Sequence, residues 1–172
     1  MTPDQMPKIP LLQQREIEAA IVGPLVRAFE REVGRERAVA ILREVITDLA
    51  RRGGRDLAVA LGTDTLEAFA GALDRWSQNG ALEIEMIEQS ADRLSFNVVR
   101  CRYAEMYRAL GLADLGAGLS CQRDFALVEG YNPEIKLERG QTLMQGASYC
   151  DFRFRRVPSS SDESAGQVEP SG

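Results

Sequence analysis

Histidine is absent from this chain of 172 residues, and lysine occurs only as Lys8 and Lys136. Without an imidazole the chain has no Ser-His-Asp or Cys-His pair, no HExxH zinc site and no histidine general base. Two lysines in polar surroundings also argue against a Schiff-base mechanism. Any chemistry must therefore depend on Cys, Asp, Glu, Tyr, Arg or a metal held by other ligands.

Long apolar runs and an excess of positive charge are also missing. No apolar stretch approaches the roughly 18 residues that a membrane span needs, and the first ten residues lack the basic and apolar regions of a signal peptide. The net charge of −5, from 21 Lys+Arg against 26 Asp+Glu, argues against a nucleic-acid partner. We therefore expect a cytoplasmic protein that binds neither nucleic acid nor membranes.

The remaining composition, 44% hydrophobic and 27% charged, is typical of one globular domain. Residues 1–10 carry three prolines, and we expect them to be flexible. Residues 157–172 are rich in Ser, Gly, Pro and acidic side chains, a composition typical of a disordered tail. Between them we expect a single α+β domain over 11–156, helical in 11–80 and mixed in 81–156.

Apolar residues recur at helical spacing in three segments of the first half, 11–33, 35–52 and 63–78. Pro24 should kink or divide the first helix. The pair Gly53-Gly54 should end the second. The apolar faces of the first two helices would pack on the domain or on another subunit, and from this we expect a homodimer.

The hydrophobic period changes in the second half. Alternation in 82–87 and 94–98 predicts a β-hairpin with its turn near 90–92. Further elements are predicted in this order: a short helix over 103–110, a helix from 114 to about 130, and strands over 135–139, 142–144 and 149–155. The predicted fold class is α+β, with N-terminal helices followed by a small antiparallel sheet and two inserted helices.

Residues able to support chemistry concentrate in this second half. Cys101, Cys121 and Cys150 are not spaced like a zinc ribbon, and we expect reduced thiols, each of which alone is compatible with a small core residue. Cys121 and Asp124 lie three residues apart on one largely apolar helix face. Burial there would raise the pKa of Asp124 toward the range of a general acid or base. The alternative is that Asp124 faces solvent or pairs with an arginine.

Cys150 lies in phase with Phe152 and Phe154 on a predicted strand. It is either a core residue or lies where the core opens into a pocket, and Gly146 upstream would let backbone amides approach a ligand. Cys101 begins a short helix between two arginines, which favours an exposed position, so it is the weakest of the three candidates.

Three arginines, Arg123, Arg139 and Arg153, are closest in sequence to these candidates. A planar guanidinium binds a substrate carboxylate through two parallel hydrogen bonds. The alternative role is structural, as an ion-pair partner for Asp124 or Asp151.

Four segments within 96–154, RCRYAEMYRALGL, LSCQRDFALVEG, RGQTLMQG and CDFRF, resemble the L-2-amino-thiazoline-4-carboxylic acid hydrolase family. The resemblance implies a hydrolase that opens or deiminates a small cyclic amidine or isothiourea carboxylic acid at a C–N or C–S bond; the alternative is a non-catalytic sensor or carrier of small molecules. It implies these site residues: Cys121, Asp124 and Cys150 as catalytic, and Arg153, Asp151, Thr142 and Gly146 as substrate-binding. We expect no cofactor, with zinc held by Cys121, Cys150 and Asp124 as the alternative.

Overall fold

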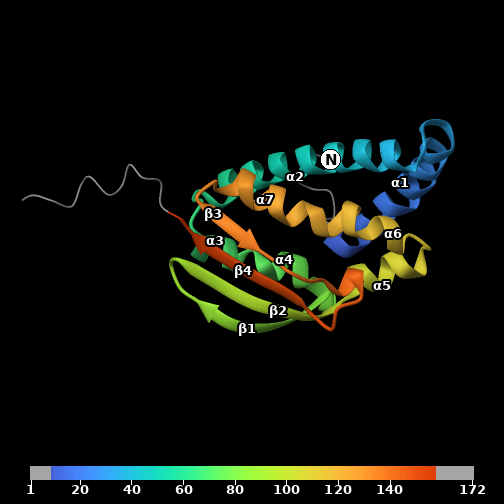
Figure 1. The fold of residues 1–172 in the computed structure, drawn as a ribbon. Coiled ribbons are helices and arrows are strands. Elements are labelled where there is room, and N and C mark those ends of the chain that lie inside the picture. Colours follow the sequence, from blue (N-terminus) through green and yellow to red (C-terminus); the bar gives the residue numbers. More distant parts are fainter. Residues whose placement is uncertain (1–8, 158–172) are drawn as a thin grey trace, which may run out of the picture.

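The computed structural model describes residues 9–157. A four-stranded antiparallel sheet packs against helices, and α7 lies between the sheet and the long helix α2 (Figure 1). The helices are α1 (Leu11–Val33), α2 (Arg35–Leu61), α3 (Leu66–Gly71), α4 (Leu73–Ser77), α5 (Arg102–Ala109), α6 (Ala113–Gly116) and α7 (Gln122–Tyr131). The strands are β1 (Leu82–Gln89), β2 (Arg93–Cys101), β3 (Ile135–Glu138) and β4 (Cys150–Arg156), in the order β1-β2-β4-β3.

The α+β class predicted from the sequence is confirmed by this arrangement. The predicted flexible start and disordered tail lie outside the described residues, apart from residues 9, 10 and 157. Within 9–157 no helix has both the length and the apolar character needed to cross a bilayer.

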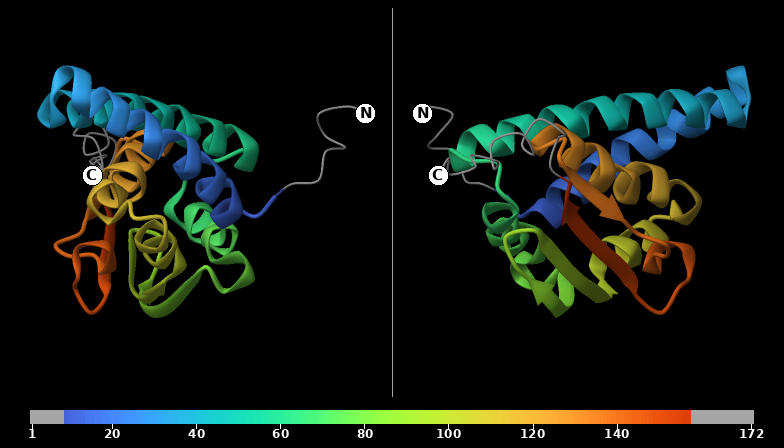
Figure 2. Two further views of the ribbon diagram at one scale, coloured as in Figure 1. Left: turned by 90° about the vertical axis from the view of Figure 1, so that its right-hand side faces the viewer. Right: turned by 60° about the vertical axis from the view of Figure 1, so that its left-hand side comes forward.

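The two long N-terminal helices form a hairpin that turns at Gly34, whose φ of 81° is readily adopted by glycine (Figure 2). α1 continues through Pro24 to Val33, so the proline does not divide it. Pro24 is exposed, and so is Ala20, whose carbonyl group loses its helical donor there. Water can therefore replace the missing hydrogen bond, which explains why the helix tolerates the proline.

The predicted end of the second helix at Gly53-Gly54 is wrong, because α2 runs on to Leu61 and ends at Gly62 with φ 68°. Gly54 instead lies where α2 crosses α7. A Cβ at Gly54 would lie 2.0 Å from the Leu127 carbonyl oxygen, and one at Gly130 would lie 2.0 Å from the Arg51 carbonyl oxygen. The two glycines therefore let the backbones of α2 and α7 touch.

Two further predictions need correction. The helix expected over 63–78 is two short helices, α3 and α4, and the first begins at Thr65, whose hydroxyl accepts the Ala68 N–H. The strand expected over 142–144 is a 3₁₀ turn, Leu143–Gln145. Thr142 caps this turn by accepting the Gln145 N–H, and Gly146 ends it with φ 95°. Such local capping competes with strand pairing.

The predicted hairpin is confirmed as β1 and β2, and β2 pairs with β4 so that Phe96 lies opposite Phe152. The chain from Ala113 to Tyr131 is helical as expected, but Ala117–Cys121 forms a π-helical turn. Such turns shift the side chains that follow them around the helix axis and are common at functional sites. This one lies directly before Asp124.

Candidate functional site

A cavity of about 600 Å³ lies among α1, α2, α7 and the sheet. Its volume falls within the range of about 300–1,000 Å³ that is usual for small-molecule sites. Its wall is mostly apolar, and the charged residues that line it are Arg15, Glu18, Arg123, Asp124 and Arg139. The cavity is therefore a mostly apolar chamber whose wall carries five charged side chains.

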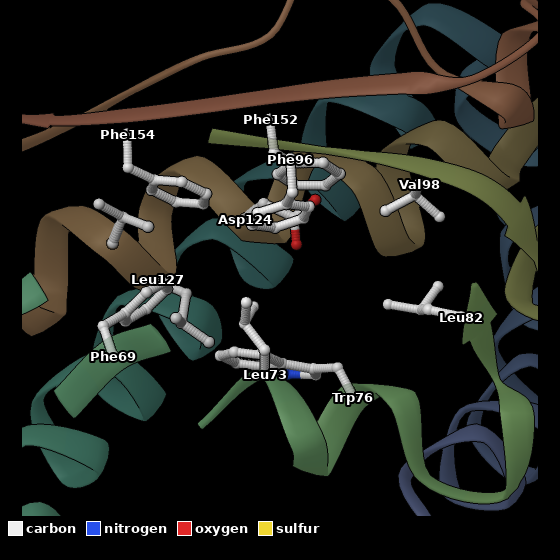
Figure 3. Close-up of a pocket in the computed structure, with 11 residues that line it drawn as sticks. Phe69, Leu73, Trp76, Leu82, Phe96, Val98, Asp124, Leu127, Phe152 and Phe154 are labelled. Carbon is white, nitrogen blue, oxygen red and sulfur yellow. The ribbon is translucent and has the colours of Figure 1, made fainter. Parts of the chain in front are cut away.

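A smaller pocket of about 60 Å³ adjoins this cavity and shares six lining residues with it, Asp124 among them. Figure 3 shows the Asp124 carboxylate among aromatic and aliphatic side chains, with Phe96 and Phe152 close by and Leu73 and Trp76 opposite. Asp124 is the only charged residue in the lining of this small pocket. The Asp124 carboxylate thus borders the apolar pocket on one side and the larger cavity on the other.

Asp124 pairs with Arg139, whose Nη1 donates to its carboxylate. The Arg139 side chain is 5% exposed, whereas the Asp124 side chain retains 39% of its surface. We attribute the exposed surface of Asp124 to the two cavities that it lines. Protein surrounds the carboxylate closely, and this burial raises the pKa of Asp124. The nearby Arg139 charge opposes this rise.

Arg139 follows β3 and is held from several directions. Its guanidinium lies 4.9 Å from the ring centroid of Phe125 and 4.9 Å from that of Phe152. Its Nη2 donates to the carbonyl oxygen of Cys121 at 2.8 Å. Cation–π contacts and hydrogen bonds together fix the planar group. Arg139 therefore has one rigid position from which to orient the Asp124 carboxylate.

A second charged group, Arg15, Arg123 and Glu18, lies on the α1 side of the cavity. Glu18 accepts from Arg15 at 2.6 Å and lies 3.5 Å from Arg123, so two guanidinium groups share one carboxylate. Burial, followed by repulsion from Arg15, lowers the pKa of Arg123. These two arginines therefore carry a surplus of positive charge that an anionic ligand would neutralise.

All three cysteines line the cavity. Burial raises the pKa of the Cys101 thiol to about 11 and that of Cys121 to about 12. Burial also raises the pKa of Cys150, although its sulfur accepts the Leu143 N–H at 3.2 Å. These thiols are therefore protonated at neutral pH and are weak nucleophiles.

The structure thus brings together Cys121, Asp124 and Cys150, the three residues that the sequence predicts as catalytic. Of the alternatives left open above, Asp124 lies in an interior environment and also pairs with an arginine, and Cys150 lies where the core opens into a cavity. Their catalytic roles stay predictions.

The four residues predicted to bind substrate are not part of the cavity lining. Arg153 donates to the Phe96 and Phe152 carbonyl oxygens and to Asn97 within the sheet. Asp151 accepts the backbone N–H groups of Gly140 and Gln141, and so anchors the loop that carries Arg139. Thr142 and Gly146 form the two ends of the 3₁₀ turn beside Cys150. Their binding roles stay predictions.

Three cavity residues carry little signal in the sequence. Cys101 was expected to be exposed between two arginines, but the structure places it in the cavity wall, because β2 ends there and its side chain turns inward. Arg15 comes from α1 and lies more than a hundred residues from Asp124, so no local pattern links them. Glu18, one helical turn later, is the partner of Arg15.

Among residues 9–157, no three His, Cys, Asp or Glu side chains are grouped so that they could hold a metal ion. The zinc site built on Cys121, Cys150 and Asp124 stays a prediction from the sequence.

A model of the L-2-amino-thiazoline-4-carboxylic acid hydrolase family matches residues 14–154. The chain belongs to this family. The match begins in α1, so it extends well beyond the segment 96–154 on which the resemblance was strongest, and it includes every charged residue of the cavity. A search of curated proteins gave no match.

Two solved structures are similar to this chain at low sequence identity. A trafficking protein particle complex subunit 3 from Naegleria fowleri, covalently bound to palmitic acid, has a TM-score of 0.51 at 10% identity, over 84% of this chain and 96% of that one. The phenol-responsive sensory domain of the transcription activator PoxR, with phenol, has a TM-score of 0.46 at 13% identity, over 80% of this chain and 74% of that one. At 10% identity the first similarity shows the fold alone.

Proposed function

We propose that this protein is a hydrolase that takes a small organic acid into the 600 Å³ cavity and adds water to it beside Asp124. One observation carries the proposal: the charged lining of an otherwise apolar chamber consists of three arginines and two carboxylates, and one of those carboxylates faces the space where a ligand fits. Membership of the family supports hydrolysis as the type of reaction.

The surplus charge at Arg15 and Arg123 is the docking point for the substrate carboxylate. Glu18 balances only one of these two cations. A ligand carboxylate would supply the missing negative charge and would accept charge-assisted hydrogen bonds from the buried guanidinium groups. This favours carboxylic acids over neutral or cationic ligands.

Asp124 is the proposed general base. Burial raises its pKa toward the range where a carboxylate can accept a proton from water, and Arg139 keeps it oriented. For a cyclic isothiourea, the water oxygen bonds to the carbon between sulfur and nitrogen, the C=N π bond opens onto nitrogen, and Asp124 carries one water proton to that nitrogen. Asp124 then takes the remaining hydroxyl proton as the carbonyl forms and the ring C–S or C–N bond breaks, and it passes that proton to the leaving atom. The product is the substrate plus one water, with Asp124 regenerated.

The cysteines have a supporting role in this scheme. A thiol with a pKa near 12, such as that of Cys121, contributes almost no thiolate at neutral pH. The Cys121 carbonyl oxygen, however, accepts from Arg139 and so helps to place the partner of Asp124. We therefore assign the reaction to a water molecule and treat Cys121 as a positioning residue.

A second candidate function is binding without turnover. The cavity is large for a single-ring amino acid derivative, and the adjoining aromatic pocket would accept an additional apolar group. The trafficking protein with a similar fold holds palmitic acid, which supports the ability of this fold to enclose an apolar ligand. On this reading the charges of the cavity select an organic acid that is sensed or carried.

One experiment separates the two candidates. Purified protein is incubated with 2-amino-thiazoline-4-carboxylate, carbamoyl-cysteine is measured by mass spectrometry, and binding is measured by calorimetry. A hydrolase gives product, and Asp124→Asn then loses at least about a hundredfold in turnover, as expected for loss of a general base. Arg123→Gln should instead weaken binding, with Arg31→Gln as the exposed control.

Three outcomes decide between the candidates. Product that disappears in Asp124→Asn supports the hydrolase. Binding without product supports the carrier or sensor. If wild-type protein neither binds nor converts this acid, the assignment of the substrate class to this cavity is wrong.

A further inference from the structure

The outer surface of the α1–α2 hairpin carries an unusual amount of exposed apolar surface. On α1, the residues Ile17, Ile21, Leu25, Phe29 and Val33 repeat every four positions and are all about half exposed. A spacing of four produces a continuous ridge along a helix, the kind of ridge that packs into the grooves of another helix.

A second ridge follows on α2, where Ile41, Val45 and Leu49 repeat at the same spacing. The exposed fractions of the eight side chains in the two ridges lie between 40% and 60%. The ridges run toward each other at the Gly34 turn, and Figure 2 shows the two helices on one side of the molecule. We call these eight residues the hairpin face.

We infer that the hairpin face binds the same face of a second copy of this chain, and that the pairing covers the opening of the cavity. Burying the exposed halves of eight such side chains removes on the order of 500 Å² of apolar surface from water per copy. A standard interface buries about 800 Å² per partner, so this face with a polar rim is large enough for a stable dimer. This area lies in the upper part of the roughly 300–600 Å² range of the largest apolar patch on a typical monomer, and such patches are often functional.

A second copy fits this surface better than an unrelated partner. A twofold axis places the same ridges on both sides, and ridges formed at a spacing of four interlock with their own copy. Exposed charges of both signs flank the ridges, such as Glu32, Arg37 and Glu44. A rim with both signs allows opposite charges to pair across a twofold axis, whereas a face of single sign would repel its copy.

The link to the cavity comes from Val45 and Leu49. Both belong to the hairpin face and both also line the 600 Å³ cavity. The cavity therefore meets the hairpin face at these two residues, on the side that the second copy would cover. Pairing would exclude water from the charged residues inside, which strengthens their interactions with a ligand.

Sedimentation velocity on the full chain tests the pairing over about a hundredfold range of concentration, because association depends on concentration. We expect a species of twice the 19.0 kDa chain mass. Ile21→Glu combined with Phe29→Glu should give a monomer with unchanged circular dichroism, since both side chains are half exposed. Val59→Glu, on α2 but outside the hairpin face and 82% exposed, should leave the dimer intact.

A thiol assay tests the covered opening without any ligand. The cysteines of the cavity should react with dithiobis-nitrobenzoate at least about threefold faster in the Ile21→Glu/Phe29→Glu monomer than in wild type, because the reagent then reaches them. Wild-type protein that sediments as a monomer, or a double variant that stays dimeric, would overturn the pairing. Equal thiol rates in dimer and monomer would overturn the covering of the cavity. None of these readouts depends on the proposed hydrolase activity.

Discussion

Arg139→Met is the substitution that tests the charged centre most directly. It removes the cation that faces Asp124, while the methionine side chain keeps apolar contact with Phe125 and Phe152. Breaking a buried ion pair by removing one partner costs about 3–5 kcal/mol. Asp124 borders a cavity, where water can solvate it, so we expect the lower end, about 3 kcal/mol or roughly a hundredfold in the unfolding equilibrium.

The loss should depend on pH in a definite direction. Burial raises the folded-state pKa of Asp124 above its unfolded value, so its contribution favours folding at low pH and is lost as the pH rises through the folded pKa. Without Arg139 that pKa rises further. The Arg139→Met penalty should therefore be small at acid pH, below the folded-state pKa of Asp124, and largest at alkaline pH, above it.

Urea denaturation of wild-type protein, Arg139→Met and Asp124→Asn/Arg139→Met at acid and at alkaline pH measures this. Asp124→Asn/Arg139→Met removes both charges and should lose only about 1–2 kcal/mol at either pH, from the lost hydrogen bond to Cys121 and weaker ring contacts. The reasoning is refuted if the double variant is as unstable as Arg139→Met, or if the Arg139→Met penalty is the same at both pH values. Either result would mean that Arg139 acts through packing and not through its charge.

Three further predictions concern the helix crossing, the thiols and the loop of Arg139. Gly130→Ala should destabilise the protein by about 3 kcal/mol or more, because its Cβ would lie 2.0 Å from the Arg51 carbonyl oxygen. Gly53 has open space around it, so Gly53→Ala should gain up to about 1 kcal/mol of stability. Thermal unfolding measures both variants, and equal losses of stability in the two would contradict the close crossing. Alkylation of Cys121 by iodoacetamide at pH 7 should be at least about tenfold slower in native protein than in urea. The rate in native protein should rise steeply with pH, because burial raises the pKa of the Cys121 thiol to about 12. Rapid labelling at pH 7 would exclude a protonated thiol. Burial acts to raise the pKa of Asp151, but the backbone N–H donors that bind it outweigh this and hold the pKa below its usual value. Its stabilisation is thus present above about pH 4 and lost as the pH falls. Asp151→Ala should therefore reduce the fall in the free energy of unfolding below about pH 4, measured by urea denaturation over a pH series. An unchanged fall in this variant would contradict the reasoning.

Patterns that depend on neighbouring residues were predictable from the sequence. Alternation along 82–87 and 94–98 predicted the β1–β2 hairpin, and the three-residue spacing of Cys121 and Asp124 placed both on one side of a helix. The positions that failed are those where tertiary contact overrides local preference. Gly54 resembles a helix end in sequence, yet it lies inside α2, where its lack of a Cβ lets the backbone of α7 pack against it.

The sequence by itself determined the α+β class and the hydrolase family, and it singled out Asp124, Arg123 and Arg139 among the five charged residues of the cavity. Hydrophobic periodicity and local motifs carry that information. Only the tertiary structure decided which charges meet. Arg15 and Glu18 come from the first helix, Asp124 from the last, and Arg139 from a loop that Asp151 anchors. The raised pKa of Asp124 and the surplus of positive charge in the cavity follow from burial and from distances across the fold, which no local stretch of residues determines.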